Sequence, residues 1–155
     1  MKYVVISGYF NPIHCGHLDY IESAKKLGDF LIVIVNNDNQ VDLKGSVPFM
    51  NEKDRTRIVS KIEDVDYAYL SFDEDSTVCN SLISMYYLYK DSENFDGMIF
   101  CNGGDRKKGD VASEEEVCKR LGIELQYNVG GKKTQSSSDL IKNSSKFGKS
   151  KIRGL

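Results

Sequence analysis

Histidine is scarce in this chain, and several features that would indicate particular classes of protein are missing. The 155 residues include two histidines, and the net charge is −2. No apolar run approaches the ~20 residues that a membrane-spanning helix needs, and the first residues form a strand pattern rather than a signal peptide. The small net charge offers no basic surface for nucleic acid. We therefore expect a cytoplasmic protein that binds neither membranes nor nucleic acids.

Other common signatures are also absent. The four cysteines, Cys15, Cys79, Cys101 and Cys118, are far apart and form no C-x-x-C pair. This spacing argues against a zinc site and favours reduced thiols. No G-x-G-x-x-G follows the first expected strand, which argues against a dinucleotide-binding or flavodoxin-like domain. Neither an internal repeat nor an interior linker is visible, so the length is that of one domain.

Both histidines lie in one short segment that separates a strand pattern from a helix pattern. Residues 3–7 predict a buried strand, and glycine together with Asn11-Pro12 predicts a turn after it. His14 and His17 lie at the start of the helix, where unpaired N–H groups and a partial positive charge favour phosphate. Two imidazoles and a helix end at one place suit a polyphosphate whose charge shifts during a reaction. Two unrelated loop histidines are the alternative.

The remainder of the chain alternates between strand and helix patterns. Apolar runs predict four further strands, at residues 30–35, 65–71, 97–101 and 123–129. We therefore predict an α/β fold, a Rossmann-like open parallel five-stranded sheet with helices on both faces. One domain is expected over residues 1–141. Residues 142–155 include basic residues and no acidic one, and we expect a flexible tail there.

The connections carry finer predictions. Residues 36–50 are expected to form a loop, and residues 73–75, Asp-Glu-Asp, a solvated loop. Ser76 is expected to cap a helix that runs to about residue 89. Ser113 with Glu116 predicts a capping box at the start of the next helix.

Two further segments of small polar residues predict sites for anions. Glycines that expose backbone N–H groups, with an acidic and a basic residue to meet ribose and phosphate, follow the fourth strand. Hydroxyls and N–H groups at a helix start follow the fifth. A tight turn and generic helix capping are the respective alternatives. The residues are Gly103, Gly104, Asp105 and Arg106 in the first segment and Ser136, Ser137 and Ser138 in the second.

The segment 8–17 resembles the signature of the HxGH nucleotidyltransferases, the cytidylyltransferase-like superfamily. It has the glycine, the aromatic residue, Asn11 and the run His14-x-Gly16-His17 in the strand-to-helix context. Cytidylyltransferases usually have Asp at the Asn11 position, whereas Asn is familiar among adenylyltransferases. The order of later features resembles heptose-phosphate adenylyltransferases over nearly the whole chain, although Arg106 replaces their usual aromatic residue.

This resemblance implies transfer of a nucleoside monophosphate from a nucleoside triphosphate to a small phosphorylated metabolite, with release of pyrophosphate. ATP and a sugar or polyol phosphate like heptose 1-phosphate are favoured; CTP with glycerol 3-phosphate is the alternative. Mg²⁺, held mainly by phosphates and water, is the implied cofactor, and a homodimer is the implied assembly. The alternative to an enzyme is a nucleotide sensor, which would bind the nucleotide without turning it over.

The resemblance also implies roles for individual residues. Arg55 would reach the acceptor or the nucleotide phosphates, unless it pairs with Glu52 or Asp54. Asp38 is interpreted equally as a turn former or as a contact to metal or acceptor. The implied catalytic residues are His14, His17 and Lys44. The implied nucleotide contacts are Gly8, Tyr9, Phe10, Asn11, Gly16, Gly103, Gly104, Asp105, Arg106, Ser136, Ser137 and Ser138, and the implied substrate contacts are Asn36, Asp38 and Arg55.

Overall fold

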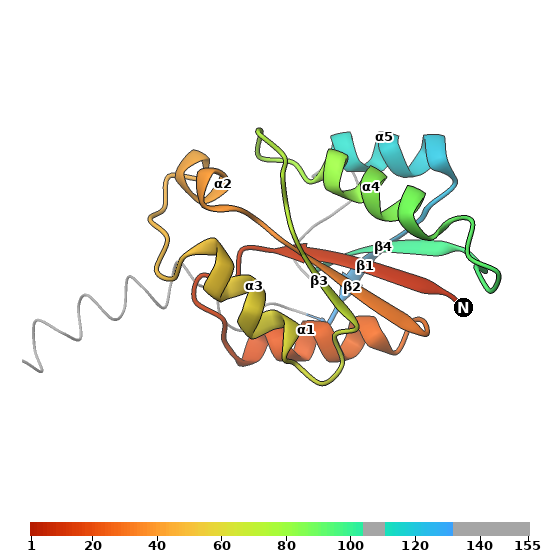
Figure 1. The fold of residues 1–155 in the computed structure, drawn as a ribbon, viewed down its shortest axis with the longest axis horizontal. Helices are drawn as coiled ribbons and strands as arrows, with labels where there is room; N and C mark the ends of the chain where they lie inside the picture. Colours follow the sequence, from red (N-terminus) through yellow and green to blue (C-terminus); the bar gives the residue numbers. More distant parts are fainter. Residues whose placement is uncertain (104–110, 132–155) are drawn as a thin grey trace, which may run out of the picture.

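A five-stranded parallel sheet forms the centre of the computed structural model, which describes residues 1–103 and 111–131 (Figure 1). The strand order is β3-β2-β1-β4-β5, and every neighbouring pair is parallel. The strands are β1 (Tyr3–Gly8), β2 (Phe30–Val35), β3 (Tyr67–Leu70), β4 (Met98–Gly103) and β5 (Glu124–Val129). The predicted fold class is thereby confirmed. The predicted limit at residue 141 and the basic tail lie outside the described residues.

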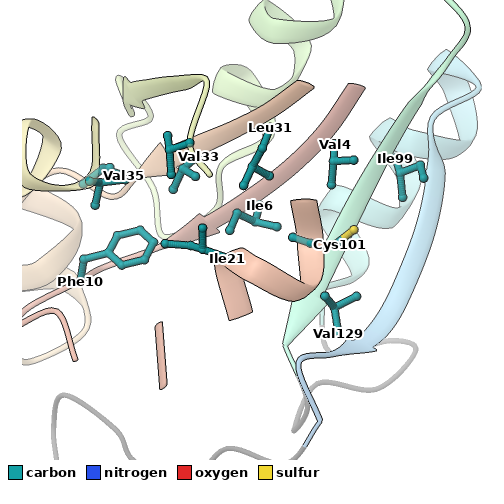
Figure 2. Packing of buried hydrophobic residues seen from close by; sticks show 13 residues of the cluster. Val4, Ile6, Phe10, Ile21, Leu31, Val33, Val35, Ile99, Cys101 and Val129 are labelled. Carbon is teal, nitrogen blue, oxygen red and sulfur yellow. The ribbon is translucent and has the colours of Figure 1, made fainter. Parts of the chain in front are cut away.

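Helices cover both faces of the sheet because successive strand residues point to opposite sides and both sides are apolar. Figure 1 shows α1 (Cys15–Lys25) and α3 (Glu52–Ser60) on one face and α4 (Cys79–Tyr89) and α5 (Ala112–Leu121) on the other. On the first face, Ile6 and Val33 pack with Ile21 of α1, as Figure 2 shows. Val5, Ile32 and Phe100 pack with Leu82 and Val117 on the second face.

Residues 38–43 form a short helix, so the loop predicted for residues 36–50 was wrong there. This helix, α2 (Asp38–Leu43), begins with a capping box. The Asn37 side chain accepts a hydrogen bond from the Gln40 backbone N–H at 2.9 Å, and Gln40 Oε1 accepts one from the Asn37 N–H at 3.0 Å. Gly45, at φ +83°, follows the C-cap Lys44 and turns the chain away. Sequence reasoning missed the helix because it is too short to show an apolar repeat.

The starts of α4 and α5 also differ from the predictions. α4 begins at Cys79 rather than after Ser76, and its cap is the Asp73 carboxylate, which accepts hydrogen bonds from the backbone N–H groups of Asn80 and Ser81 at 2.8 and 3.0 Å. Asp73 is 2% exposed, so interpreting it as part of a solvated loop was wrong. The capping box predicted at the start of α5 is not formed among the described residues, where Val111 is the N-cap residue.

The structure also bears on membrane association. Among residues 1–103 and 111–131, no helix has both the length and the apolar character needed to cross a bilayer.

Candidate active site

The carboxyl ends of β1, β2 and β4 meet at one edge of the sheet because the three strands are parallel and adjacent. Gly8, the last residue of β1, is in register with Val35, the last of β2. The strand order reverses at β1, since β2 lies on one side of it and β4 on the other. Open α/β sheets bind their ligands at such a switch point, and the histidine segment leaves β1 there.

The two imidazoles are held together at the N-terminus of α1. His14 is the N-cap residue, and its Nδ1 accepts a hydrogen bond from the Gly16 N–H at 3.1 Å. His17 Nδ1 accepts one from the His14 N–H at 3.1 Å, so the two rings form a reciprocal capping box. The rings stack with centroids 3.8 Å apart. Because each Nδ1 accepts a hydrogen bond, the proton of each neutral ring lies on Nε2, which makes both Nε2 atoms donors.

Gly8 and Phe10 shape the loop from within. Phe10 has φ +51° and is 1% exposed, and its ring packs edge-on against His17 with centroids 4.9 Å apart. A Cβ at Gly8 would lie 2.9 Å from Phe10 Cζ, so glycine is needed to let the ring fold back over β1. The side chain of Phe10 is part of the core beneath His17, and the contact of this residue to nucleotide stays a prediction.

Asn11, also predicted to contact nucleotide, connects the histidine segment to the loop before α3. It is 4% exposed, and its peptide bond to Pro12 is cis. Asn11 Nδ2 donates to the Val47 carbonyl at 3.0 Å, and Asn11 Oδ1 accepts from the N–H groups of Phe49 and Met50 at 2.5 and 3.3 Å. In this conformation its side chain therefore fixes the position of one loop against the other.

Arg55 is fully buried at the same edge and donates to four acceptors from three chain segments. Its Nε donates to the Met50 carbonyl at 2.9 Å, and Nη1 donates to the carbonyls of Tyr9 and Asn36 at 2.7 and 2.6 Å. Nη2 donates to Asp38 Oδ1 at 2.7 Å. The partner of the guanidinium is thus Asp38, rather than Glu52 or Asp54. With no exposed surface in this conformation, Arg55 sets the geometry of this edge. Its contact to substrate stays a prediction.

Asn36 and Asp38 are brought to this arrangement from the end of β2. Asn36 is 4% exposed, and its Nδ2 donates to Gln40 Oε1 at 3.1 Å. The carboxylate of Asp38 is neutralised by Arg55, and its backbone N–H donates to Glu52 Oε1 at 3.0 Å. Asp38 is the first residue of a helix, α2, and not part of a turn, while its contact to metal or acceptor stays a prediction.

Lys44 lies over the histidine segment from the far end of α2. Its Nζ is 4.3 Å from the centroid of the Tyr9 ring. The backbone N–H of Lys44 donates to the Gln40 carbonyl at 3.1 Å, which closes the helix. The Lys44 ammonium, from the segment that follows β2, therefore lies beside the loop that carries both histidines.

Seven predicted nucleotide contacts remain, and the structure describes one of them. Gly103 ends β4, next to β1 at the switch point. The rest lie outside the described residues: Gly104, Asp105, Arg106, Ser136, Ser137 and Ser138. The structure therefore gives no geometry for the predicted nucleoside contacts or for the serine cluster.

Sequence reasoning missed several polar residues at this edge. Gln40 is fully buried and donates from Nε2 to the carbonyls of Asp75 and Thr77 at 2.9 and 2.8 Å. Asn102, just before Gly103, is 4% exposed, and its Nδ2 has no hydrogen-bond partner within the described part of the chain. Asn before Gly is typical of a turn, so nothing in the sequence pattern indicates a buried amide.

Three of the four cysteines are buried or half-buried and none of these three is an activated nucleophile. Burial raises the pKa of the Cys101 and Cys118 thiols to about 12. Cys79 is half-buried, and burial raises its pKa as well. Cys15, next to His14, is exposed and all four thiols are reduced. Within the described ranges, no group of three His, Cys, Asp or Glu side chains could hold a metal ion.

At the carboxyl ends of β1 and β2, most of the groups described above are hydrogen-bond donors or carry positive charge. The helix N-terminus, the two imidazoles and the Lys44 ammonium all favour an anion, although the His14 Nε2 atom is itself buried. The nearby Asp38 carboxylate is paired with Arg55. Such an arrangement can bind a polyphosphate and stabilise negative charge that develops on it.

The sequence is also similar to the sequences of known proteins. Residues 5–142 match the family model described as Cytidylyltransferase-like. The chain is 36% identical over 120 residues to an FAD synthase of Ferroglobus placidus, covering 77% of this chain and 70% of that protein. It is 32% identical over 147 residues to the Bifunctional protein HldE of Aliarcobacter butzleri, covering 94% of this chain but only 28% of HldE.

Solved structures show the same fold. A lipopolysaccharide core biosynthesis protein from Thermoplasma volcanium superposes with a TM-score of 0.64 at 26% identity, covering 83% of this chain and 96% of that one. A putative nicotinate-nucleotide adenylyltransferase from Vibrio parahaemolyticus gives 0.58 at 18% identity, covering 92% of this chain and 85% of that one, a likeness of fold alone. The chain spans about half the length of another FAD synthase, from Thermoplasma acidophilum, which it matches at 40% identity.

Proposed function

Because the chain belongs to the cytidylyltransferase-like family, we propose that it transfers a nucleoside monophosphate from ATP to the phosphate of a small sugar or polyol phosphate, such as heptose 1-phosphate. Pyrophosphate is the second product. The observation that carries the proposal is the imidazole pair, whose rings are held at the N-terminus of α1 by hydrogen bonds to both Nδ1 atoms. The chain is an enzyme of the nucleotidyltransferase type; donor, acceptor and residue roles are the proposed part.

The reaction is an in-line displacement at phosphorus. An oxygen of the acceptor phosphate forms a bond to the α-phosphorus, and the bond from that phosphorus to the α,β-bridging oxygen breaks, so that pyrophosphate leaves with the electron pair. A phosphate monoester is already ionised near neutral pH, so no general base is required. Catalysis then depends on positioning and on stabilising negative charge. His14 and His17 would donate from Nε2 to the triphosphate, and Lys44 would bind the α-phosphate and the acceptor.

Mg²⁺ is part of the proposal as a partner of the triphosphate. Bound there, it would neutralise part of the phosphate charge. Asp38, the carboxylate at the end of β2, is already paired with Arg55 at 2.7 Å. Phosphate oxygens and water would therefore supply most of the metal ligands. A homodimer in the cytoplasm remains our expected assembly and location, and light scattering from the full chain would test the assembly.

The acceptor has a second candidate. An FAD synthase of Ferroglobus placidus shares 36% identity over 70% of its length, a larger share of its chain than the 28% matched in HldE. Flavin mononucleotide also presents a phosphate monoester, so the same displacement would join it to AMP. CTP with glycerol 3-phosphate is the third pairing, and Asn11 favours ATP over it only through the family resemblance.

A matrix of substrates tests the proposal. The four nucleoside triphosphates are each combined with heptose 1-phosphate, glycerol 3-phosphate and flavin mononucleotide, and pyrophosphate is measured. We expect release with ATP and one acceptor, and a loss of about 10²–10³-fold in His17→Ala, in line with removal of one stabilising donor. No release in any combination, with ATP still bound, would favour the nucleotide sensor. Unchanged release by folded His17→Ala would remove His17 from the mechanism.

A further inference from the structure

Asn102, the residue before Gly103 at the end of β4, differs from the other buried polar residues. Its side chain is 4% exposed, and Nδ2 donates no hydrogen bond within residues 1–103 and 111–131. The other eight polar or charged residues that are buried in these ranges all make side-chain hydrogen bonds. Because a buried donor without an acceptor costs stability, such a donor at a candidate site indicates a ligand that supplies the acceptor.

The position of Asn102 is the point where β4 separates from β1. β1 pairs with β2 along its whole length, whereas its pairing with β4 ends at Val5 and Phe100. β4 itself continues to Gly103, because it stays paired with β5. Asn102 therefore lies on the β4 side of the switch point, beyond the last residue that pairs with β1, where open α/β sheets bind their ligands.

The backbone around Asn102 is fixed, while the space beside it is open. The preceding carbonyl, of Cys101, accepts a hydrogen bond from the Tyr20 hydroxyl of α1 at 2.8 Å. Apart from its chain neighbours, no heavy atom of the described residues would lie within 4 Å of a Cβ on Gly103. A ligand group could therefore approach the end of β4 without separating the strands.

The alternation of side chains along β4 places the amide on the face of the sheet opposite α1. Ile99 and Cys101 belong to the core on the α1 side, as Figure 2 shows, and Phe100 belongs to the core on the α4 side. Since successive side chains of a strand point to opposite faces, Asn102 shares the face of Phe100. A nucleotide whose phosphates lie at the N-terminus of α1 would thus meet Asn102 with its nucleoside.

We propose that Asn102 binds the adenine of ATP through its carboxamide and is a specificity-determining residue of the nucleotide site. This inference rests on the proposed function, in which the phosphates lie at the imidazole pair. A carboxamide has a donor and an acceptor side by side, and adenine presents the complementary pair at N7 and the N6 amino group. Nδ2 donates to N7, and Oδ1 accepts from the amino group. Hypoxanthine has a carbonyl in place of that amino group, and one carboxamide cannot donate to both of its acceptors.

The experiment compares Asn102→Leu and Asn94→Leu in the full chain. Asn94 is exposed in the segment before β4, at the opposite end of that strand, which makes it the matched control. Calorimetric titration with Mg²⁺ present gives the affinities for ATP, for inosine triphosphate and for inorganic tripolyphosphate, which has no base.

The expected result is selective for the base. Asn102→Leu should weaken ATP binding by about 10- to 100-fold, the discrimination that one bidentate amide–base contact provides. It should also bring the affinities for ATP and inosine triphosphate close together and leave tripolyphosphate binding unchanged. Asn94→Leu should change none of the three affinities.

Stability gives a second readout, which should change in the opposite direction. Leucine is similar in size to asparagine but has no donor to leave unsatisfied in the ligand-free protein, so Asn102→Leu should raise the urea midpoint of unfolding. A lower midpoint with unchanged ATP affinity would assign Asn102 a structural role and overturn the proposal. Asn102→Ala replaces Asn102→Leu in the titrations if circular dichroism shows that the leucine variant does not fold.

The affinities also separate the possible failures. Unchanged ATP binding, equal losses for ATP and tripolyphosphate, or equal losses for ATP and inosine triphosphate would each overturn the proposal. An original chain that binds ATP but releases no pyrophosphate with any acceptor would count against the proposed function alone, and the affinities would still decide the role of Asn102. An original chain that binds no ATP would overturn both.

Discussion

At the scale of single residues, Arg55 has more influence on the candidate site than its position in the sequence indicates. Its guanidinium binds the carbonyls of Tyr9, Asn36 and Met50 and the carboxylate of Asp38. Three of these four acceptors are backbone groups, and they lie in segments far apart in sequence. A sequence pattern shows charged neighbours but not the carbonyls that folding brings close, which is why Glu52 and Asp54 were the expected partners.

Replacing Arg55 tests this account of the edge. Arg55→Met keeps the length of the side chain but leaves the Asp38 carboxylate and three carbonyls without their donor. We expect the free energy of unfolding to fall by about 3–5 kcal/mol, as when one partner of a buried ion pair is removed. Urea unfolding followed by circular dichroism measures it. Arg57→Met, on the exposed side of α3, is the matched control and should change stability by no more than about 0.5 kcal/mol.

The cysteines provide a second residue-scale prediction. With a pKa raised by burial to about 12, the Cys101 and Cys118 thiols are ionised in about one molecule in 10,000 at pH 8. Iodoacetamide at pH 8 should therefore modify the exposed Cys15 first and these two only after unfolding in urea. A time course by peptide mass spectrometry checks the order. Equal rates at Cys15 and Cys101 in the native protein would contradict the burial described here.

At the scale of elements, long apolar patterns were predictable and short polar ones were not. Each strand was found within a few residues of its prediction, because runs buried on both faces are continuous in sequence. The six-residue helix α2 and the starts of α4 and α5 were missed or misplaced. Their ends depend on hydrogen bonds such as those of Asp73, whose acceptor role is set by how β3 meets α4.

Asp73 should determine the stability of α4. Its carboxylate accepts hydrogen bonds from two backbone N–H groups at the start of the helix and from the hydroxyls of Ser71 and Ser81. Because these donors would be left buried, Asp73→Ala should lower the free energy of unfolding by about 2–3 kcal/mol. Glu74→Ala, at the exposed neighbouring position, is the control. Equal stability of the two variants in urea would contradict the capping role.

At the scale of the whole molecule, the parallel sheet explains why distant residues meet. Three strands end at one edge, and the segments that follow β1 and β2 are then joined by Arg55, Asn11 and the Tyr9–Lys44 contact. The identity of the histidine segment and its place at a strand end were predictable from residue types. Which of these residues are buried and which are exposed could not be predicted from residue types. Phe10, Asn11 and Arg55 are examples, because their side chains could contact a ligand but are buried.

The most direct test of the account concerns the imidazole pair. The chain has two histidines, so a long-range ¹H–¹⁵N spectrum of the full chain contains two imidazole spin systems. We predict that both rings carry their proton on Nε2 in the neutral form, and that ATP with Mg²⁺ shifts the Nε2 signals of both. Protons on Nδ1, or Nε2 signals that ATP leaves unchanged at saturating concentration, would contradict the assignment of this edge as the triphosphate site.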